Sequence, residues 1–307
     1  MTLQVITDRL RFPEGPIALS DGSVVVVEIE GGALTRVHPS GDLEVISQLD
    51  GGPNGAALGP DGWVVVANSG GWLYTSEANG WRRPTGQSDV PGWIERVSLV
   101  TGESQRLYDA SGGMRLQSPN DLVFDALGNL YVTDHGKRDG RTLGLGAIHY
   151  GAPDGSFLRP VVSGLLTPNG VGLSADGKTL FVAETVTRRI LSYPVVAPGE
   201  VSLLPWPAPA GGHLVAGLPD RNFLDSMALD AEGHICVASF NACGIWRISP
   251  DGAARTFTPL DDYYATNIAF GGPDRRTAFV TLSSTGRLVS FEWPCPGQPL
   301  AFEGPAS

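Results

Sequence analysis

The chain has 307 residues, 42% of them hydrophobic and 17% charged, a composition typical of a folded globular protein that excludes a disordered one. Its 41 Gly and 24 Pro residues show no collagen-like period and favour many short strands joined by tight turns. Because 32 Asp and Glu outnumber 21 Lys and Arg, the net charge of −11 argues against nucleic acid as a partner.

The N-terminal segment MTLQVITDRLRFPEGP has no long apolar core and no basic start, so it does not predict a secretory signal. No run of 18 apolar residues follows it, so we expect no membrane span and no membrane partner. The three cysteines lack metal-ligand spacing and indicate structural thiols of a reduced, cytoplasmic protein; they are Cys236, Cys243 and Cys295.

One pattern recurs six times along the chain. A polar residue opens a short apolar stretch, a turn with Asp-Gly or a relative follows, and a β-rich run comes after the turn. The copies begin at Glu14, Asn54, Asn120, Asn169, Asp225 and Asn267. Their spacings of 40, 66, 49, 56 and 42 residues predict loops of different length on a common scaffold.

Each copy predicts a β-hairpin, as in the first, where residues 17–19 form a strand, Asp21-Gly22 turns, and residues 24–27 return. A third strand follows in each copy, such as ALTRVHPSG, and in several a fourth, such as DLEVISQL. Four antiparallel strands per repeat are the blade of a propeller. The sequence therefore predicts an all-β, six-bladed β-propeller that forms one domain over residues 1–307.

The two chain ends are expected to complete the ring. The sixth copy ends near Trp293, which leaves little chain for its outermost strand, and the N-terminal LQVITDRL could supply that strand. Pairing of the first and last segments would remove an open sheet edge. A pair of β-sandwiches or a jelly roll would leave the six copies unexplained.

The residues that open the six copies all carry a side-chain oxygen, and in a propeller they would converge on the central axis. One interpretation is that Asn and Asp cap turns at strand ends, which suits the Asn-Gly pairs at Asn54 and Asn169 but not Glu14. The other is a hard divalent cation, because Ca²⁺ binds carboxylate and amide oxygens. Without the ion, two carboxylates in a narrow channel would repel each other.

The cation interpretation accounts for more of the pattern. Two carboxylates and two amides supply a charge of −2, and no His or Cys belongs to the set. This donor chemistry favours Ca²⁺, with Mg²⁺ next, over structural zinc. Mn²⁺, Fe²⁺ and catalytic Zn²⁺ are alternatives at an open site.

These motifs resemble the gluconolactonase / senescence-marker-protein (regucalcin) family of six-bladed propellers, and more remotely diisopropyl-fluorophosphatase. The resemblance extends from Phe12 to Thr281, and its most specific pieces open four of the repeats. They are Glu14 in FPEGP, Asn120 in PND, Asn169 in PNG, and Asp225 at the start of DSMALDAEGHICVA.

The resemblance implies a divalent metal bound by Glu14, Asn169 and Asp225, with Asn120 as a fourth ligand or acting through water. It also implies that Asp225 acts as the catalytic base. Family members are typically lactonases, several of them acting on aldonolactones. Many carry an Arg two residues before the third-repeat Asn, where this chain has Ser118, so a lactone in general is expected more than a sugar lactone.

Two loops could provide specificity. The longest insertion contains four aromatic residues that could cover the site or pack on an outer strand: Trp72, Tyr74, Trp81 and Trp93. The segment 134–141 offers His135 and three cations that could hold a carboxylate or leaving group, or form a solvated turn. The residues predicted to contact or support the substrate are Asn54, Ser118, Asn120, Asp121, His135 and Asn267, with Asp121 behind Asn120.

The sequence thus predicts a divalent-metal-dependent hydrolase that opens a lactone by a polarised carbonyl and an activated water. The alternatives are a phosphotriesterase-like hydrolase and a non-catalytic Ca²⁺-binding propeller. We expect a small-molecule substrate as the partner, and a monomer or small homo-oligomer.

Overall fold

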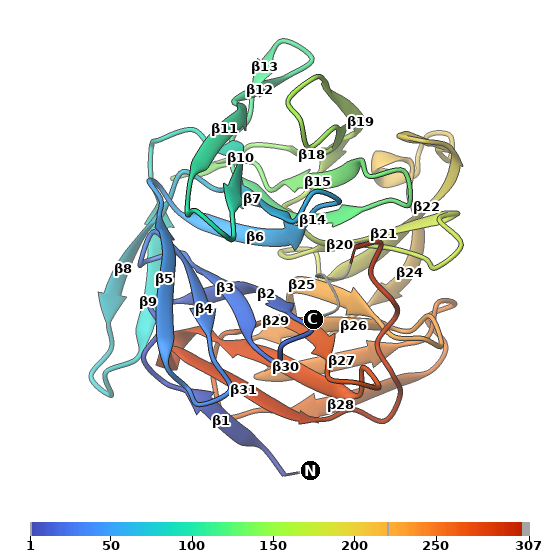
Figure 1. The fold of residues 1–307 in the computed structure, drawn as a ribbon. Helices are drawn as coiled ribbons and strands as arrows, with labels where there is room; N and C mark the ends of the chain where they lie inside the picture. Colours follow the sequence, from blue (N-terminus) through green and yellow to red (C-terminus); the bar gives the residue numbers. More distant parts are fainter. Residues whose placement is uncertain (1, 220, 303–307) are drawn as a thin grey trace.

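A ring of six antiparallel sheets makes up the computed structural model, which describes residues 2–219 and 221–302 (Figure 1). Five of these sheets have four strands and one has five. Successive innermost strands contact each other around the whole ring, so the ring is closed. The prediction of an all-β, six-bladed propeller is confirmed.

The first three blades follow each other in chain order. Blade 1 contains β2 (Pro13–Ala18), β3 (Val24–Glu28), β4 (Ala33–Val37) and β5 (Leu43–Gln48). Blade 2 contains β6 (Pro53–Leu58), β7 (Trp63–Asn68), β10 (Trp93–Ser98) and β11 (Ser104–Tyr108). Blade 3 contains β14 (Pro119–Phe124), β15 (Leu130–Asp134), β18 (Gly146–Gly151) and β19 (Leu158–Leu165).

The remaining blades complete the circle. Blade 4 contains β20 (Pro168–Leu173), β21 (Thr179–Glu184), β22 (Arg189–Ala197) and β24 (His213–Gly217), with the short β23 (Glu200–Val201) on the end of β22. Blade 5 contains β25 (Phe223–Leu229), β26 (Ile235–Phe240), β27 (Gly244–Ile248) and β28 (Arg255–Pro259). Blade 6 contains β29 (Ala265–Gly271), β30 (Thr277–Leu282), β31 (Arg287–Glu292) and β1 (Gln4–Thr7).

The insertions between blade strands are short hairpins and turns. They are β8 (Trp72–Ser76) with β9 (Arg82–Gln87), β12 (Ala110–Ser111) with β13 (Met114–Arg115), β16 (Arg138–Asp139) with β17 (Thr142–Leu143), and the 3₁₀ turns η1 (Pro209–Gly211) and η2 (Ser283–Thr285). Within the described residues, no helix has the length and apolar character needed to cross a bilayer.

The ring is closed by the N-terminal strand, as the sequence predicts. Strand β1 pairs antiparallel with β31, and Gln4 and Val5 lie opposite Ser290 and Val289. The first strand of the chain therefore covers the outer edge of the last blade, which leaves blade 6 with the same four strands as its neighbours.

The core lies between neighbouring blades. The middle strands are apolar on both faces because each blade is covered by the next, as in Val25 and Val27 of β3, which share a buried cluster with Val64 and Val66 of β7. Each such side chain contributes roughly 1.5–3 kcal/mol by leaving water. The consecutive valines thus follow from two-sided burial rather than from one-sided alternation.

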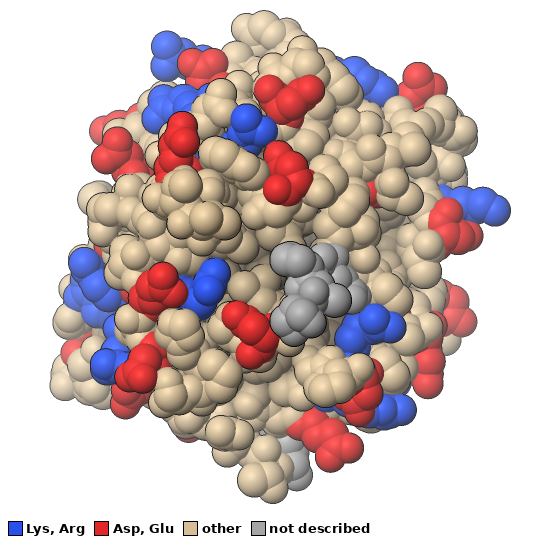
Figure 2. Space-filling model, in the orientation of Figure 1, with Lys and Arg blue, Asp and Glu red and all other residues tan. Residues whose placement is uncertain are grey.

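The C-terminal segment crosses the ring on the face that carries the first turn of each blade (Figure 1). Gly297 donates its N–H to Arg275 of blade 6, and Gln298 donates its backbone N–H to Leu229 of blade 5 and its side-chain amide to Leu173 of blade 4. Phe302 then packs edge-on against Phe124 of blade 3, with ring centroids 5.6 Å apart. Figure 2 shows that Lys and Arg on this face are dispersed among Asp and Glu.

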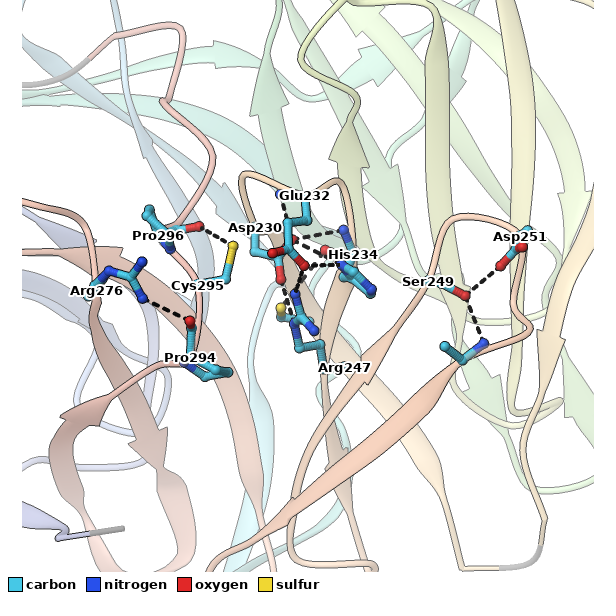
Figure 3. Close-up of polar contacts among 12 residues, drawn as sticks. Asp230, Glu232, His234, Arg247, Ser249, Asp251, Arg276, Pro294, Cys295 and Pro296 are labelled. Carbon is cyan, nitrogen blue, oxygen red and sulfur yellow. Dashed lines mark hydrogen bonds and ion pairs between the residues drawn. The ribbon is translucent and has the colours of Figure 1, made fainter.

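The attachment of this segment to blade 5 is polar (Figure 3). Asp230, directly after β25, accepts a hydrogen bond from the Arg247 guanidinium at 2.6 Å and further ones from the backbone N–H groups of Glu232 and His234. Ala231 donates its N–H to Pro296 at 2.8 Å. The C-terminal segment, held by blade 5, therefore covers one end of the channel. The innermost strands begin at the other end.

Candidate active site

The six residues that open the repeats occupy one structural position. Four of them are the second residue of an innermost strand and follow a proline, and Asp225 and Asn267 are the third. All six side chains are buried. A proline costs no ladder hydrogen bond at the first position of a strand, which explains why it recurs there.

A β-bulge lies at this position in every innermost strand. The pairing with the second strand of the blade shifts between Glu14 and Ile17 in blade 1, and a shift in the first residues recurs in the other five blades. A bulge turns one side chain away from the regular alternation of a strand. The bulges therefore account for polar side chains that point to the channel from strands that are otherwise apolar.

The glycines after these residues serve close packing of adjacent strands. A Cβ on Gly55 would lie 2.3 Å from the carbonyl oxygen of Asn120, and one on Gly170 would lie 2.7 Å from that of Asp225. The Asn-Gly pairs at Asn54 and Asn169 thus belong to strands, and glycine is needed because the next blade approaches the backbone. The turn-capping interpretation of these pairs is wrong.

A cavity of about 950 Å³ lies at this end of the channel and brings the predicted ligands together. It is lined by five of the six opening side chains: Glu14, Asn54, Asn120, Asn169 and Asp225. His135 lines it as well. The four residues predicted to hold a metal therefore line the same cavity.

Several buried polar atoms in the cavity wall have no hydrogen-bond partner among the described residues. They are Glu14 Oε1, Tyr74 Oη, Asn120 Oδ1, His135 Nδ1 and Thr185 Oγ1. Folded proteins pair nearly all buried polar groups, because an unpaired one costs about 1–3 kcal/mol. A concentration of unpaired donors and acceptors around one cavity is typical of a ligand site.

Glu14 is held by one oxygen and offers the other. Its Oε2 accepts the N–H of Gly15 and the side-chain amide of Asn267, the latter at 2.7 Å. Its Oε1 has no partner among the described residues. Burial raises the pKa of Glu14 well above its ordinary value, and the negative charge of Asp225 raises it further.

Asp225 is the second carboxylate of the cavity. Burial raises its pKa to about 8, a hydrogen bond with Asn169 opposes the rise, and the charge of Asp121 adds to it. Two buried carboxylates whose pKa values are both raised form a favourable environment for a divalent cation, which would cancel their charge.

The donor set fits a hard cation. Among the described residues, no group of three or more His, Cys, Asp and Glu side chains is arranged to hold a metal, so a centre here depends on amide oxygens beside its two carboxylates. Asn120 Oδ1 and Glu14 Oε1 are unpartnered oxygens in the same cavity. Oxygen donors of this mixture are those that Ca²⁺ and Mg²⁺ bind.

Three predicted substrate contacts lie behind the cavity wall instead. Asp121 accepts the N–H groups of Leu122 at 2.9 Å and Val171 at 3.2 Å, so its carboxylate ties blade 3 to blade 4, and burial raises its pKa to about 7. Ser118 donates its N–H to Asp134 at 2.7 Å. Asn267 holds Glu14. None of the three belongs to the cavity lining. Asn267 contacts Glu14 of the lining, and Ser118 accepts hydrogen bonds from His135 and Gln87 of the lining.

The hairpin β8–β9 covers the site. Trp72 and Tyr74 line the cavity, whereas Trp81 lies outside the lining and Trp93 is buried in blade 2. The hairpin is tied to blade 1 by an ion pair between Arg82 and Glu30. Of the four predicted aromatic residues, the two in β8 therefore reach the site.

The segment after β15 holds the other side of this cover. Lys137 donates to the carbonyl oxygens of Ser88 and Val90, just beyond β9. His135 stacks edge-on against Trp72 with ring centroids 6.5 Å apart, and burial lowers its pKa to about 4, so its ring is neutral. The segment 134–141, for which the sequence leaves open a site for a carboxylate or leaving group and a solvated turn, thus contributes to the cavity wall.

Sequence reasoning missed a second set of lining residues. Phe12, Thr167 and Phe223 stand two positions before Glu14, Asn169 and Asp225, and all three line the cavity. Phe12 and Thr167 have φ of 57° and 54°, a left-handed conformation that residues with a side chain rarely adopt. The fixed offset from each opening residue is the signal that could have found them.

Several known proteins have sequences similar to this chain. A Zymomonas mobilis gluconolactonase is 27% identical over 277 residues, which cover 81% of this chain and 70% of that protein. Lactonase drp35 of Staphylococcus epidermidis is 31% identical over 121 residues, only 35% of its own length. Diisopropyl-fluorophosphatase of Loligo vulgaris is 28% identical over 200 residues, which cover 60% of each protein.

The solved structure of a gluconolactonase from Xanthomonas campestris has the same fold, with a TM-score of 0.74 over 95% of this chain and 89% of that one at 20% identity. The family model described as the SMP-30/Gluconolactonase/LRE-like region matches residues 12–284, from the start of the first blade to the turn after β30 of the sixth. The chain therefore belongs to the SMP-30/gluconolactonase/LRE-like family.

Proposed function

We propose that this protein is a hydrolase of lactones that uses one divalent cation bound by Glu14, Asn120, Asn169 and Asp225. The observation that carries the proposal is the pair of unpartnered oxygens, Glu14 Oε1 and Asn120 Oδ1, in the cavity that also holds Asp225. The gluconolactonase and lactonase relatives support the reaction class. Ca²⁺ is the expected ion, and Mg²⁺, Mn²⁺, Zn²⁺ and Fe²⁺ are alternatives.

The reaction needs a polarised carbonyl, an activated water and a stabilised oxyanion. A bound divalent cation supplies Lewis acidity for the first and the third. Asp225 accepts the proton of the attacking water, a contribution of ~10²–10⁴-fold.

The other residues position this chemistry. Asn267 fixes the Glu14 carboxylate by its 2.7 Å hydrogen bond, which leaves Oε1 directed to the cavity. Asn54 adds an amide to the wall, and neutral His135 adds an unpartnered ring nitrogen. The cover formed by β8–β9 reduces access of bulk water to the substrate. We propose a small molecule as the only partner that the reaction requires.

Proton release from a panel of lactones tests the proposal, with chelator treatment and metal add-back. Asp225→Asn should lower kcat by about 10²-fold or more because it removes the base. Asp109→Asn is the matched control, since Asp109 is exposed and outside the cavity lining. Equal hydrolysis with and without metal, or by wild type and Asp225→Asn, would contradict the proposal.

Hydrolysis of organophosphorus esters is the second candidate, because the Loligo diisopropyl-fluorophosphatase matches this chain as well as the gluconolactonase does in identity. The same cation and base would serve a phosphoryl centre. A phosphotriester panel in the same assay separates the two candidates. A protein that binds the ion but hydrolyses neither panel would be a non-catalytic Ca²⁺-binding propeller.

A further inference from the structure

One wall of the cavity is a continuous row of aromatic rings. Tyr74 contacts Phe12 with centroids 4.9 Å apart, Phe12 contacts Tyr264 at 5.5 Å, and Tyr264 stacks on Phe240 at 5.1 Å. Phe240 stacks on Phe223 at 5.4 Å. All five residues line the cavity. They come from blades 1, 5 and 6 and from the hairpin β8–β9, so this wall is aromatic and largely apolar.

The positive charge of the cavity comes from a different insertion. Arg138 in β16 and Arg141 in the turn before β17 line the cavity, and they are the two Lys or Arg residues of the lining that the structure describes. This hairpin is inserted in blade 3, which lies across the ring from blade 6, and blade 6 carries Tyr264 of the aromatic row.

The two guanidinium groups have no partner among the residues that the structure describes. No hydrogen bond or ion pair of either side chain is found within residues 2–219 and 221–302, although the backbone N–H of Arg138 donates to Gln87 at 2.8 Å. Neighbouring Lys137 behaves differently, since its ammonium group is engaged by the carbonyls of Ser88 and Val90. Lys137 therefore fixes the hairpin, and the arginines remain available to a ligand.

We infer that the substrate is a lactone with a flat apolar body and an anionic substituent, such as a carboxylate, that Arg138 and Arg141 bind. This inference rests on the proposed function. An arginine binds a carboxylate through two parallel hydrogen bonds, which gives orientation as well as affinity. The apolar body lies on the aromatic row, and the reacting carbonyl is placed over the floor where Glu14 and Asp225 lie.

The same walls disfavour a sugar lactone. An aldonolactone would place hydroxyls against the rings of Phe12, Phe223 and Phe240, which cannot pair with them, and each unpaired hydroxyl costs binding energy. Many members of the family that the motifs resemble have an arginine at the position of Ser118, and Ser118 lies outside the cavity lining. The cations of this site come from the blade 3 insertion instead.

Binding to metal-stripped protein tests the arginines without any turnover. Calorimetry would compare 3-phenylpropionate with its neutral isostere 3-phenylpropionamide, so that neither a metal nor hydrolysis contributes. Wild type should bind the anion about tenfold more tightly, a preference that falls as salt screens the charges. The variant Arg138→Gln/Arg141→Gln should lose the preference, and the control Arg115→Gln, from the exposed β13, should keep it.

Kinetics with the metal-loaded protein separates this inference from the proposed function. The substrates are a phenyl-substituted lactone that carries a carboxylate and its carboxamide analogue. The double arginine variant should raise KM for the carboxylate about tenfold, leave kcat nearly unchanged, and leave both constants for the carboxamide unchanged.

Each outcome decides one of the two proposals. If both lactones are hydrolysed equally well by wild type and the double variant, and the anion has no binding advantage, the inference is overturned and the lactonase stands. If no lactone is hydrolysed but the anion preference depends on the arginines, the anion site stands and the lactonase fails.

Discussion

Two buried aspartates five positions apart show how differently the two ends of the channel are built. Asp230, at the end covered by the C-terminal segment, is fully paired with Arg247 and backbone N–H groups (Figure 3). Asp225, at the other end, faces a second carboxylate, and the pKa values of both are raised. The protein neutralises the first charge itself and leaves the second for a ligand. This contrast indicates that Asp230 serves the stability of the fold and that Asp225 serves ligand binding or the reaction.

The largest expected difference concerns activity. Asp225→Asn should reduce kcat by about 10²-fold or more without loss of folding, because it removes a base and relieves repulsion with Glu14. Thermal unfolding in chelator should show a Tm equal to or above that of wild type. A variant that unfolds would show that Asp225 is structural, and the contrast with Asp230 would disappear.

The reverse substitution should affect stability. Asp230→Asn removes the partner of a part-buried Arg247 and should lower the free energy of unfolding by about 3 kcal/mol. Denaturant titration measures this loss, and the remaining folded protein should keep its kcat. Wild-type stability with a lower kcat would place Asp230 in the reaction and contradict the division between the two ends.

Loss of the hydrogen bond from Asn267 to Glu14 should have a smaller effect, and this effect should be on metal affinity. Asn267→Ala removes the 2.7 Å hydrogen bond that orients the carboxylate and should weaken metal affinity about tenfold. Calorimetric titration with Ca²⁺ measures the change, and Asn129→Ala, at the far end of blade 3, is the control. An unchanged affinity would mean that Glu14 needs no support.

The pH dependence of stability should be the smallest signal. In the metal-free protein Asp225 has a pKa of about 8, above its unfolded value, so the folded state binds the extra proton between these values. Its contribution to stability is fully present below the unfolded pKa and is lost as the pH rises to about 8. The Tm in chelator should therefore fall over this range, and Asp225→Asn should flatten the curve. A wild-type curve that rises over the same range would have the wrong sign.

The repeated part of the molecule could be predicted from the sequence, and the non-repeated part could not. Equivalent positions such as Glu14 and Asn169 recur in every blade, so their convergence follows once the hairpins are recognised. The closing strand β1 follows from the missing fourth strand of blade 6. The purpose of the glycine after Asn54 could not be predicted, because only the approach of blade 3 reveals it.

The specificity elements carry no such signal. Phe240 and Tyr264 stack on each other although they come from two blades, and nothing in their spacing brings them together. The sequence leaves the segment of Arg138 and Arg141 open between a site for a carboxylate or leaving group and a solvated turn, since its position at the cavity depends on how Lys137 fastens the hairpin. Contacts between insertions are decided by tertiary packing, which sequence periodicity does not report.

Elemental analysis of purified, dialysed protein tests the central claim most directly. Wild type should retain one divalent cation per chain after incubation with Ca²⁺, and Glu14→Gln/Asp225→Asn should retain none. A wild type that binds no cation, or a double variant that binds it equally well, would contradict the assignment of the channel as a metal centre.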